Sequence, residues 1–588
     1  MLRFLSNLSA NLLALFIFFF VIPVLGFVFI VFFAVQSAMT SVGQKNAETF
    51  KPGGALVYDL GTNIVEGTSQ TGSVSALFTN GVSLSVYDIC ARISSVSGGD
   101  GQSVLFIHGS FDNAYDPPSF AQISEIRAQI ERFKSLGGKV FAYLEYPSLR
   151  DYYLASAADR VILNPQSTME FKGLSATSPY FGNALKKYGV DVQVVKSGEF
   201  KNFGEMFTSD KMSAEDKVHL EGILKAIWNS IVERISISRG IPIETLNSIA
   251  QNGALFTAQD AIKMGLVDDA MFEDEILDLM ANTVGSSGDT FLQNSIFSVD
   301  VQQPKSAPKV AVVYMRGNIV GRGDMNTISA EYYAPLFREI RRDKNIRAVV
   351  IRVDSGGGSA FASEAIRREI ELTAQEMPVV ASFGGIAASG AYWFGCAAEE
   401  IIVTPQTITG SIGVFGLAFS AEKLAGDFGI TFDGVKTAPF ADIGTIARPM
   451  SEQEVAKLQS LIDVVYGDFV RLVSNSRKMS VEEARALANG RIYSAGQAMN
   501  LRLADKIGGL GDAITSAAEK AGLTSFAVDQ YPKYDPFKEL FKEFMPPGQY
   551  AFELPREVRS VKDTLAVLAQ FNERSKIYAR MPFDLRFE

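Results

Sequence analysis

Apolar and polar residues alternate along most of the chain in the pattern of buried strands separated by amphipathic helices. Short apolar runs such as SVLFIHG (103–109) and KVFAYLE (139–145) predict strands, and FAQISEIRAQIERFKSL (120–136) predicts a helix between them. The second half repeats this pattern with PKVAVVYMRG (308–317), IRAVVIRVDS (346–355) and later runs. Strands alternating with helices predict βαβ units around a largely parallel sheet, so the expected fold class is α/β.

Similar segments recur about 240 residues apart. YYLASAADRVILNP (152–165) matches YWFGCAAEEIIVTP (392–405) without a gap, and YGVDVQVVKSGEF (188–200) matches FGITFDGVKTAPF (428–440) at the same offset. A period this long indicates duplicated domains rather than a solenoid. The chain of 588 residues is also too long for one ordinary core. We therefore expect a first domain over 45–297, a linker over 298–309, a second domain over 310–529 and a C-terminal tail over 530–588.

The N-terminal region has a different pattern. From Leu12 to Val35 there is no charged side chain. At ~1.5 Å per residue such a run spans a ~30 Å hydrocarbon core, and it exceeds the ~7–15 residues of a secretory apolar region. We expect an uncleaved transmembrane anchor within residues 1–44, with the rest of the chain on one side of the membrane. In a bacterium this would be the periplasmic side of the inner membrane.

Charge and cysteine content exclude several functions. The net charge of −10 argues against a nucleic-acid-binding protein, which usually carries a basic face. The two cysteines, Cys90 and Cys396, lie far apart in apolar surroundings. They exclude a disulfide framework and a cysteine-based zinc site.

Ser389 is the one serine in FGGIAASGAYWFG (383–395), a segment of small and apolar residues. A nucleophilic serine needs a base, but both histidines, His108 and His219, lie in the first repeat. A Ser–His–Asp triad formed within the second domain is thus impossible, whereas a Ser–His–Asp triad formed across the two domains remains open. The alternative base is a lysine whose neutral form is favoured by burial.

The repeat offers a candidate lysine. At the offset of 240, Ser389 aligns with Leu149, and Lys201 aligns with Ala441. Each copy lacks the partner that the other copy has. Division of labour between duplicated domains would produce this pattern, but so would drift at two unrelated positions.

A glycine-rich turn in DSGGGS (354–359) follows an apolar strand and precedes a predicted helix. Glycine lets the backbone approach a substrate closely, so the amide of Gly358 or a neighbour could bind an oxyanion together with the amide of Gly390. A phosphate-binding loop is the alternative, but neither GxxxxGK[ST] nor GxGxxG with an acidic partner is present.

DSGGGS, PVVASFGGIAASGAYW (378–393) and TGSIGVFG (409–416) together resemble peptidase family S49, the signal peptide peptidase A family, in its long, duplicated, membrane-anchored form. The resemblance covers roughly residues 45–525 and the anchor. It implies two tandem domains of the ClpP/crotonase superfamily and cleavage of remnant signal peptides near the membrane. It further implies a homotetramer and no metal or cofactor.

Carried over residue by residue, the resemblance implies that Ser389 is the nucleophile and Lys201 the general base. Gly357, Gly358 and Gly390 would supply the oxyanion hole, and Ser411 would orient the lysine. One departure is Gly356, where the family usually has proline, so the turn is expected to be less rigid.

Two other functions remain open: an inactive membrane-bound scaffold with the same fold, and a crotonase-type acyl-CoA enzyme. The tail is also ambiguous. Residues 560–581 are expected to form an amphipathic helix, and the end of the chain could be a flexible terminus, an inter-subunit strap or an occupant of the active-site groove.

Overall fold

The computed structural model describes residues 54–69, 83–97, 103–285, 293–304, 306–323, 327–533 and 577–581. The predicted anchor within residues 1–44 lies outside these ranges. Across the described ranges, no helix combines the length and apolar character needed to cross a membrane.

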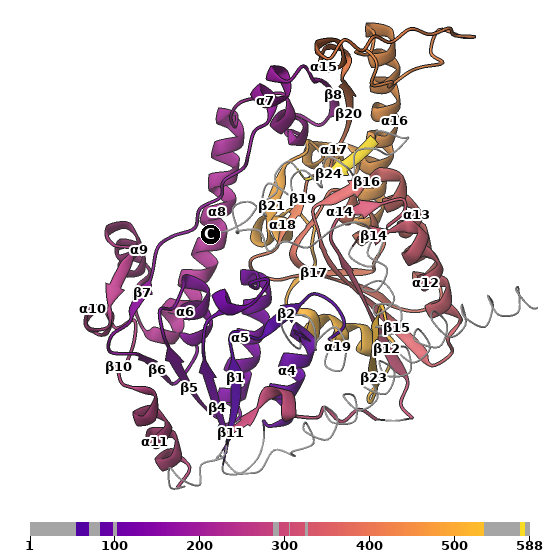
Figure 1. Ribbon diagram of the computed structural model, residues 1–588. Helices are drawn as coiled ribbons and strands as arrows, with labels where there is room; N and C mark the ends of the chain where they lie inside the picture. The colour runs from indigo at the N-terminus through magenta and orange to yellow at the C-terminus, as the bar shows by residue number, and fades with distance from the viewer. Residues whose placement is uncertain are drawn as a thin grey trace, which may run out of the picture.

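Two parallel series of strands form the centres of the two halves of the molecule (Figure 1). The order in the first half is β10 (Asp269–Ala270), β6 (Arg160–Leu163), β5 (Lys139–Leu144), β4 (Val104–His108), β1 (Ala55–Asp59) and β11 (Gln293–Ser295). The order in the second is β22 (Lys506–Ile507), β18 (Glu400–Val403), β17 (Val379–Ala388), β15 (Ile346–Ser355), β12 (Lys309–Arg316) and β23 (Ala527–Tyr531). Each neighbouring pair in both series is parallel. The matching order confirms the mixed α/β class and the duplication.

Amphipathic helices cover both sheets. The helix predicted over 120–136 is α5 (Phe120–Ser135), which begins with a capping box between Ser119 and Gln122. Its buried residues include Ile123, Ile126 and Ile130, which recur at helical spacing and join the first core. In the second half, α13 (Ala360–Ala374) follows the glycine-rich turn, and the side chain of Ser359 caps its N-terminus.

Strand β8 (Asp191–Ser197) belongs to the first repeat but pairs with the second half. It runs antiparallel to β20 (Val414–Ser420) along its whole length, from Ser197 opposite Val414 to Asp191 opposite Ser420. The aligned segment of the second repeat, 428–440, forms no strand and is exposed. This crossing carries the residues that follow β8 into the second half.

The end of the chain also joins the second half. Strand β24 (Ile577–Arg580) lies between β16 (Gly357–Ser359) and β20 and is antiparallel to both (Figure 1). The helix predicted over 560–581 is therefore wrong for its last residues, and the rest of that range lies outside the described structure. A strand is favoured here because β16 and β20 each offer a free edge to the segment, and all four residues of β24 are buried.

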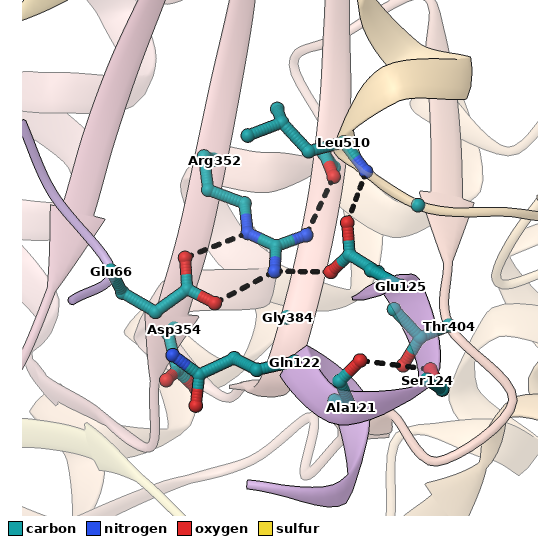
Figure 2. Close-up of polar contacts among 12 residues, drawn as sticks. Glu66, Ala121, Gln122, Ser124, Glu125, Arg352, Asp354, Gly384, Thr404 and Leu510 are labelled. Atoms are coloured by element: carbon teal, nitrogen blue, oxygen red, sulfur yellow. Dashed lines mark hydrogen bonds and ion pairs between the residues drawn. The ribbon is translucent and has the colours of Figure 1, made fainter. Parts of the chain in front are cut away.

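A buried ion-pair cluster joins the two halves of the molecule (Figure 2). Arg352 on β15 contacts Glu66 at 2.7 Å and Glu125 of α5 at 2.5 Å. Glu125 also accepts a 2.5 Å hydrogen bond from the amide of Leu510, at the start of α19 (Leu510–Lys520). Burial raises the pKa of Glu125, and Arg352 opposes that shift. Since β15 ends at Ser355, the cluster fixes the strand that leads into the glycine-rich turn.

Candidate active site

Ser389 occupies a strained turn between β17 and α14 (Gly390–Gly395). Its backbone φ of 59° lies in the left-handed region, which a non-glycine residue rarely adopts. A 2.7 Å hydrogen bond from its amide to the carbonyl of Gly410 holds the turn. The side chain is fully buried. This conformation places the hydroxyl at the junction of strand and helix rather than in the sheet.

Lys201 comes from the first half and meets Ser389. It lies four residues after β8, and its Nζ is 2.6 Å from Ser389 Oγ. The side chain is 0% exposed, and burial holds the pKa of Lys201 well below its usual value. The neutral amine is therefore favoured, and its lone pair can accept the proton of Ser389.

Ser411 supplies the remaining partners of the lysine amine. Its carbonyl oxygen lies 2.7 Å and its Oγ 2.9 Å from Lys201 Nζ. A neutral amine has two N–H donors and one lone pair, so two bonds to Ser411 leave the lone pair for Ser389. Ser411 also has a positive φ, 51°, and its amide donates to the carbonyl of Arg491 at 2.6 Å. Two oxygen atoms of Ser411 thus contact the amine of Lys201.

The three predicted oxyanion glycines meet beside Ser389, but their amides differ. The Gly357 amide donates to Ser355 Oγ at 3.1 Å, which engages it within the turn. Gly358 lies opposite Ala579 of β24 and Ile319 of β13 (Ile319–Val320), and Gly390 begins α14. At position 357 a side chain would not fit. The φ of Gly357 is 102°, and a Cβ there would lie only 2.9 Å from Gly390 N.

The profile of peptidase family S49 matches residues 132–287 and 371–524, one segment in each half. The chain belongs to peptidase family S49. Among its relatives, Protease 4 of Salmonella typhi is 29% identical over 94% of both chains. Protease 4 of Haemophilus influenzae is 30% identical over 82% of this chain and 81% of that protein. Serine protease SPPA, chloroplastic, of Arabidopsis thaliana is 28% identical over 69% of this chain and 62% of that protein. The chain is thus a serine peptidase of this family.

Other candidate bases of this S49 peptidase lie elsewhere. His108 stacks on Phe106 at the end of β4, with ring centroids 5.3 Å apart. The Nε2 of His219 lies 2.8 Å from the carbonyl oxygen of Ile492. Lys196 contacts Asn202 and, at 3.3 Å, Glu205. In the described part of the chain, Lys201 is the polar partner that contacts Ser389 Oγ.

Sequence reasoning did not identify Gly490, which shapes the lysine site. A Cβ on Gly490 would lie 2.5 Å from Lys201 N, and the φ of Gly490 is 86°. The carbonyl of the preceding Asn489 accepts a 2.7 Å hydrogen bond from Phe200 N. The signal was present: Asn-Gly opens both 252–268 and 489–505, which match as repeats. Only the fold shows that the second copy supports Lys201.

Within the described residues, no group of histidine, cysteine, aspartate and glutamate side chains could hold a metal ion.

Proposed function

We propose that this S49 peptidase is a membrane-anchored serine endopeptidase that uses a Ser389–Lys201 dyad. The distance of 2.6 Å between Lys201 Nζ and Ser389 Oγ carries the proposal. Burial of the amine and its two contacts to Ser411 support it. The dyad joins two domains, 45–297 and 310–529, across the linker 298–309, with both domains of the ClpP/crotonase type. Strand β23 extends the second domain to Tyr531, two residues beyond the expected boundary.

The proposed reaction uses one base twice. Neutral Lys201 accepts the proton of Ser389 as Oγ attacks the carbonyl carbon of a peptide bond. The amides of Gly358 and Gly390 stabilise the tetrahedral oxyanion. The C–N bond then breaks, and Lys201 delivers its proton to the leaving amine. A water molecule gives a proton to the same amine while it attacks the acyl ester, which releases the acid and restores Ser389.

The proposed substrates are remnant signal peptides or other short apolar peptides at the membrane. The position between β16 and β20, which β24 takes in this structure, suits an extended peptide, because backbone pairing there does not depend on side chains. The apolar run from Leu12 to Val35 supports a single-pass anchor. In a bacterial cell the catalytic domains would then lie on the periplasmic side of the inner membrane.

An exposed apolar segment supports assembly into a ring-like homotetramer. Between residues 428 and 446, large apolar side chains are exposed at Phe428, Ile430, Phe432, Val435, Phe440, Ile443 and Ile446. This segment is the repeat of β8, whose partner β20 corresponds to 174–180 at the offset of 240. Residues 174–180 form no strand. Pairing of 428–440 in one chain with 174–180 in the next would repeat the β8–β20 contact head to tail and close a ring.

Peptide hydrolysis by purified full-length protein tests the activity. Wild type should hydrolyse a short apolar peptide, whereas Ser389→Ala and Lys201→Ala should be folded and inactive. Lys187→Met, which changes an exposed lysine near β8, serves as the control and should remain active. An inert wild type would favour the scaffold. Activity in Lys201→Ala would rule out the dyad.

A further inference from the structure

Helix α8 (Ala214–Arg239) brings a histidine of the first half to a strand of the second half (Figure 1). His219, near the start of α8, lies with its Nε2 2.8 Å from the carbonyl oxygen of Ile492, the first residue of β21 (Ile492–Ser494). A carbonyl oxygen only accepts hydrogen bonds, so Nε2 carries a proton and donates it. His219 therefore links the two halves of the molecule by a defined hydrogen bond.

Residues 489–492, which end at this carbonyl, border the backbone of Lys201. The carbonyl of Asn489 accepts a 2.7 Å hydrogen bond from the amide of Phe200. A Cβ on Gly490 would lie 2.5 Å from Lys201 N, so the two backbones are in close contact. The position of residues 489–492 therefore sets the position of the lysine backbone.

The same residues also hold the other groups of the site. The carbonyl of Arg491 accepts a 2.6 Å hydrogen bond from the amide of Ser411, whose oxygens contact the lysine amine. Ile492 is opposite Gly410 in the antiparallel pair of β21 and β19 (Ile408–Gly410), and the Gly410 carbonyl holds the amide of Ser389. A shift of residues 489–492 would thus move both partners of the lysine amine.

The imidazole ring of His219 makes a second contact at this site. It packs edge-on against the Phe200 ring, with centroids 5.8 Å apart and an interplanar angle of 75°. The guanidinium of Arg491 lies 4.1 Å from the centroid of the same ring. The side chain that immediately precedes Lys201 is therefore held by groups from α8 and from residues 489–492.

The residue after Lys201 is also bound by α8. Asn202 Nδ2 donates to both carboxylate oxygens of Asp216, at 3.1 and 2.9 Å. Asp216 is buried and lies three residues before His219 on the helix. One turn of α8 thus contacts Asn202 through Asp216 and Phe200 through His219, the two neighbours of the lysine.

The surroundings of His219 favour the neutral imidazole. Within the described residues, its Nδ1 is buried and has no hydrogen-bond partner, so a second proton there would lack an acceptor. Burial lowers the pKa of His219; the bond to Ile492 opposes that shift, as does the charge of Asp216, whereas Arg491 adds to it. The ring therefore keeps one charge state over the alkaline range in which a lysine base works.

We propose that His219 is a positioning residue for Lys201: its Nε2–H holds the Ile492 carbonyl, and residues 489–492 in turn fix the lysine and Ser411. The inference rests on the proposed dyad and adds to it a residue that touches no reacting atom. Without this bond, residues 489–492 would lose their tie to α8, and water would reach the lysine amine more easily. The amine would then be both misplaced and more readily protonated.

Hydrolysis of a short apolar peptide by the full-length protein between pH 6 and 10 tests the proposal, with kcat referred to the folded fraction. His219→Phe keeps a ring against Phe200 and removes the donor. It should lower kcat by about 10–10²-fold with KM little changed, since displacing a reacting group by about 1 Å costs up to about 10²-fold. The ionisation in the kcat profile should move up toward the ordinary lysine pKa. His219→Gln, whose amide can donate to the Ile492 carbonyl, should restore most of kcat and the wild-type ionisation.

The control is His108→Phe, which removes the other histidine of the chain and should match wild type. A His219→Phe enzyme with the kcat and ionisation of wild type would overturn the proposal, even with a lower Tm. A His219→Gln enzyme as impaired as His219→Phe would also overturn it, because ring packing would then be the cause. Both results leave the dyad intact, whereas activity in Lys201→Ala would overturn the dyad and the role of His219 together.

Discussion

Lys201 Nζ lies 2.6 Å from Ser389 Oγ, although 188 residues separate the two in the chain. Two features of the fold bring them together. The β8–β20 pairing brings the segment before Lys201 to the second half. The strained turn after β17 directs the serine hydroxyl toward Lys201. The arrangement requires both repeats, so neither half alone holds the candidate site.

The burial of Lys201 should reduce stability at neutral pH. In the unfolded chain a lysine has a pKa near ~10.4, while burial lowers the pKa in the folded state. At a pH between these two pKa values, the unfolded state binds more protons than the folded state. The free energy of unfolding therefore rises with pH up to ~10.4. Lys201→Met should therefore raise Tm at pH 7 by about 1–2 °C, for ~1–2 kcal/mol, and the difference should shrink toward pH 10. Thermal melts at both pH values measure this, and a lower Tm for the variant at pH 7 would contradict it.

Two neighbouring glycines should respond differently to substitution. Gly357→Ala places a methyl group where the Ala579 carbonyl oxygen lies, at a φ of 102°. The methyl group would separate a substrate oxygen from the Gly390 amide, so kcat/KM should fall by about 10²–10³-fold, the scale of losing one oxyanion contact. Gly356→Ala meets only the Cβ of Met581, at 3.8 Å, and should stay close to wild type. Similar losses in both variants would show that the turn is sensitive to any added side chain.

The Arg352 cluster should contribute strongly to stability. Arg352→Met leaves the buried carboxylates of Glu66 and Glu125 without their partner, and we expect a loss of about 3–5 kcal/mol. Arg502→Met, which breaks an exposed pair with Glu483, should change stability by less than about 1 kcal/mol. Denaturant unfolding compares the two variants. Equal losses of unfolding free energy in the two variants would show that the buried cluster stabilises the fold no more than an exposed ion pair does.

Assembly should depend on the exposed apolar segment. Val435→Asp combined with Phe432→Asp adds charge to a surface that the ring would bury, and the variant should have a lower mass than wild type. Light scattering coupled to size-exclusion chromatography of the full chain in detergent measures this. A wild-type monomer, or a variant with unchanged mass, would count against the ring.

The sequence predicted the mixed α/β class and the duplication, but it did not predict the course of the C-terminal segment. The repeat alone left the pairing of Ser389 with Lys201 open, because drift at two unrelated positions would give the same pattern, and the pairing was implied by the resemblance to family S49. Gly490 was missed because its role depends on backbone contact with Lys201, which no local pattern encodes. Residues 577–580 were assigned to a helix because strand pairing with β16 and β20 is a tertiary interaction that overrides local periodicity.

The most direct test of the dyad is the rate at which a fluorophosphonate labels Ser389 between pH 6 and 10, with the adduct located by mass spectrometry. A protonated Lys201 cannot accept the serine proton, so labelling of wild type should increase with pH through a single ionisation below the usual lysine pKa. Lys201→Met should abolish labelling at every pH, and Lys187→Met should match wild type. Labelling of Lys201→Met at the wild-type rate, or an adduct on a residue other than Ser389, would contradict the account.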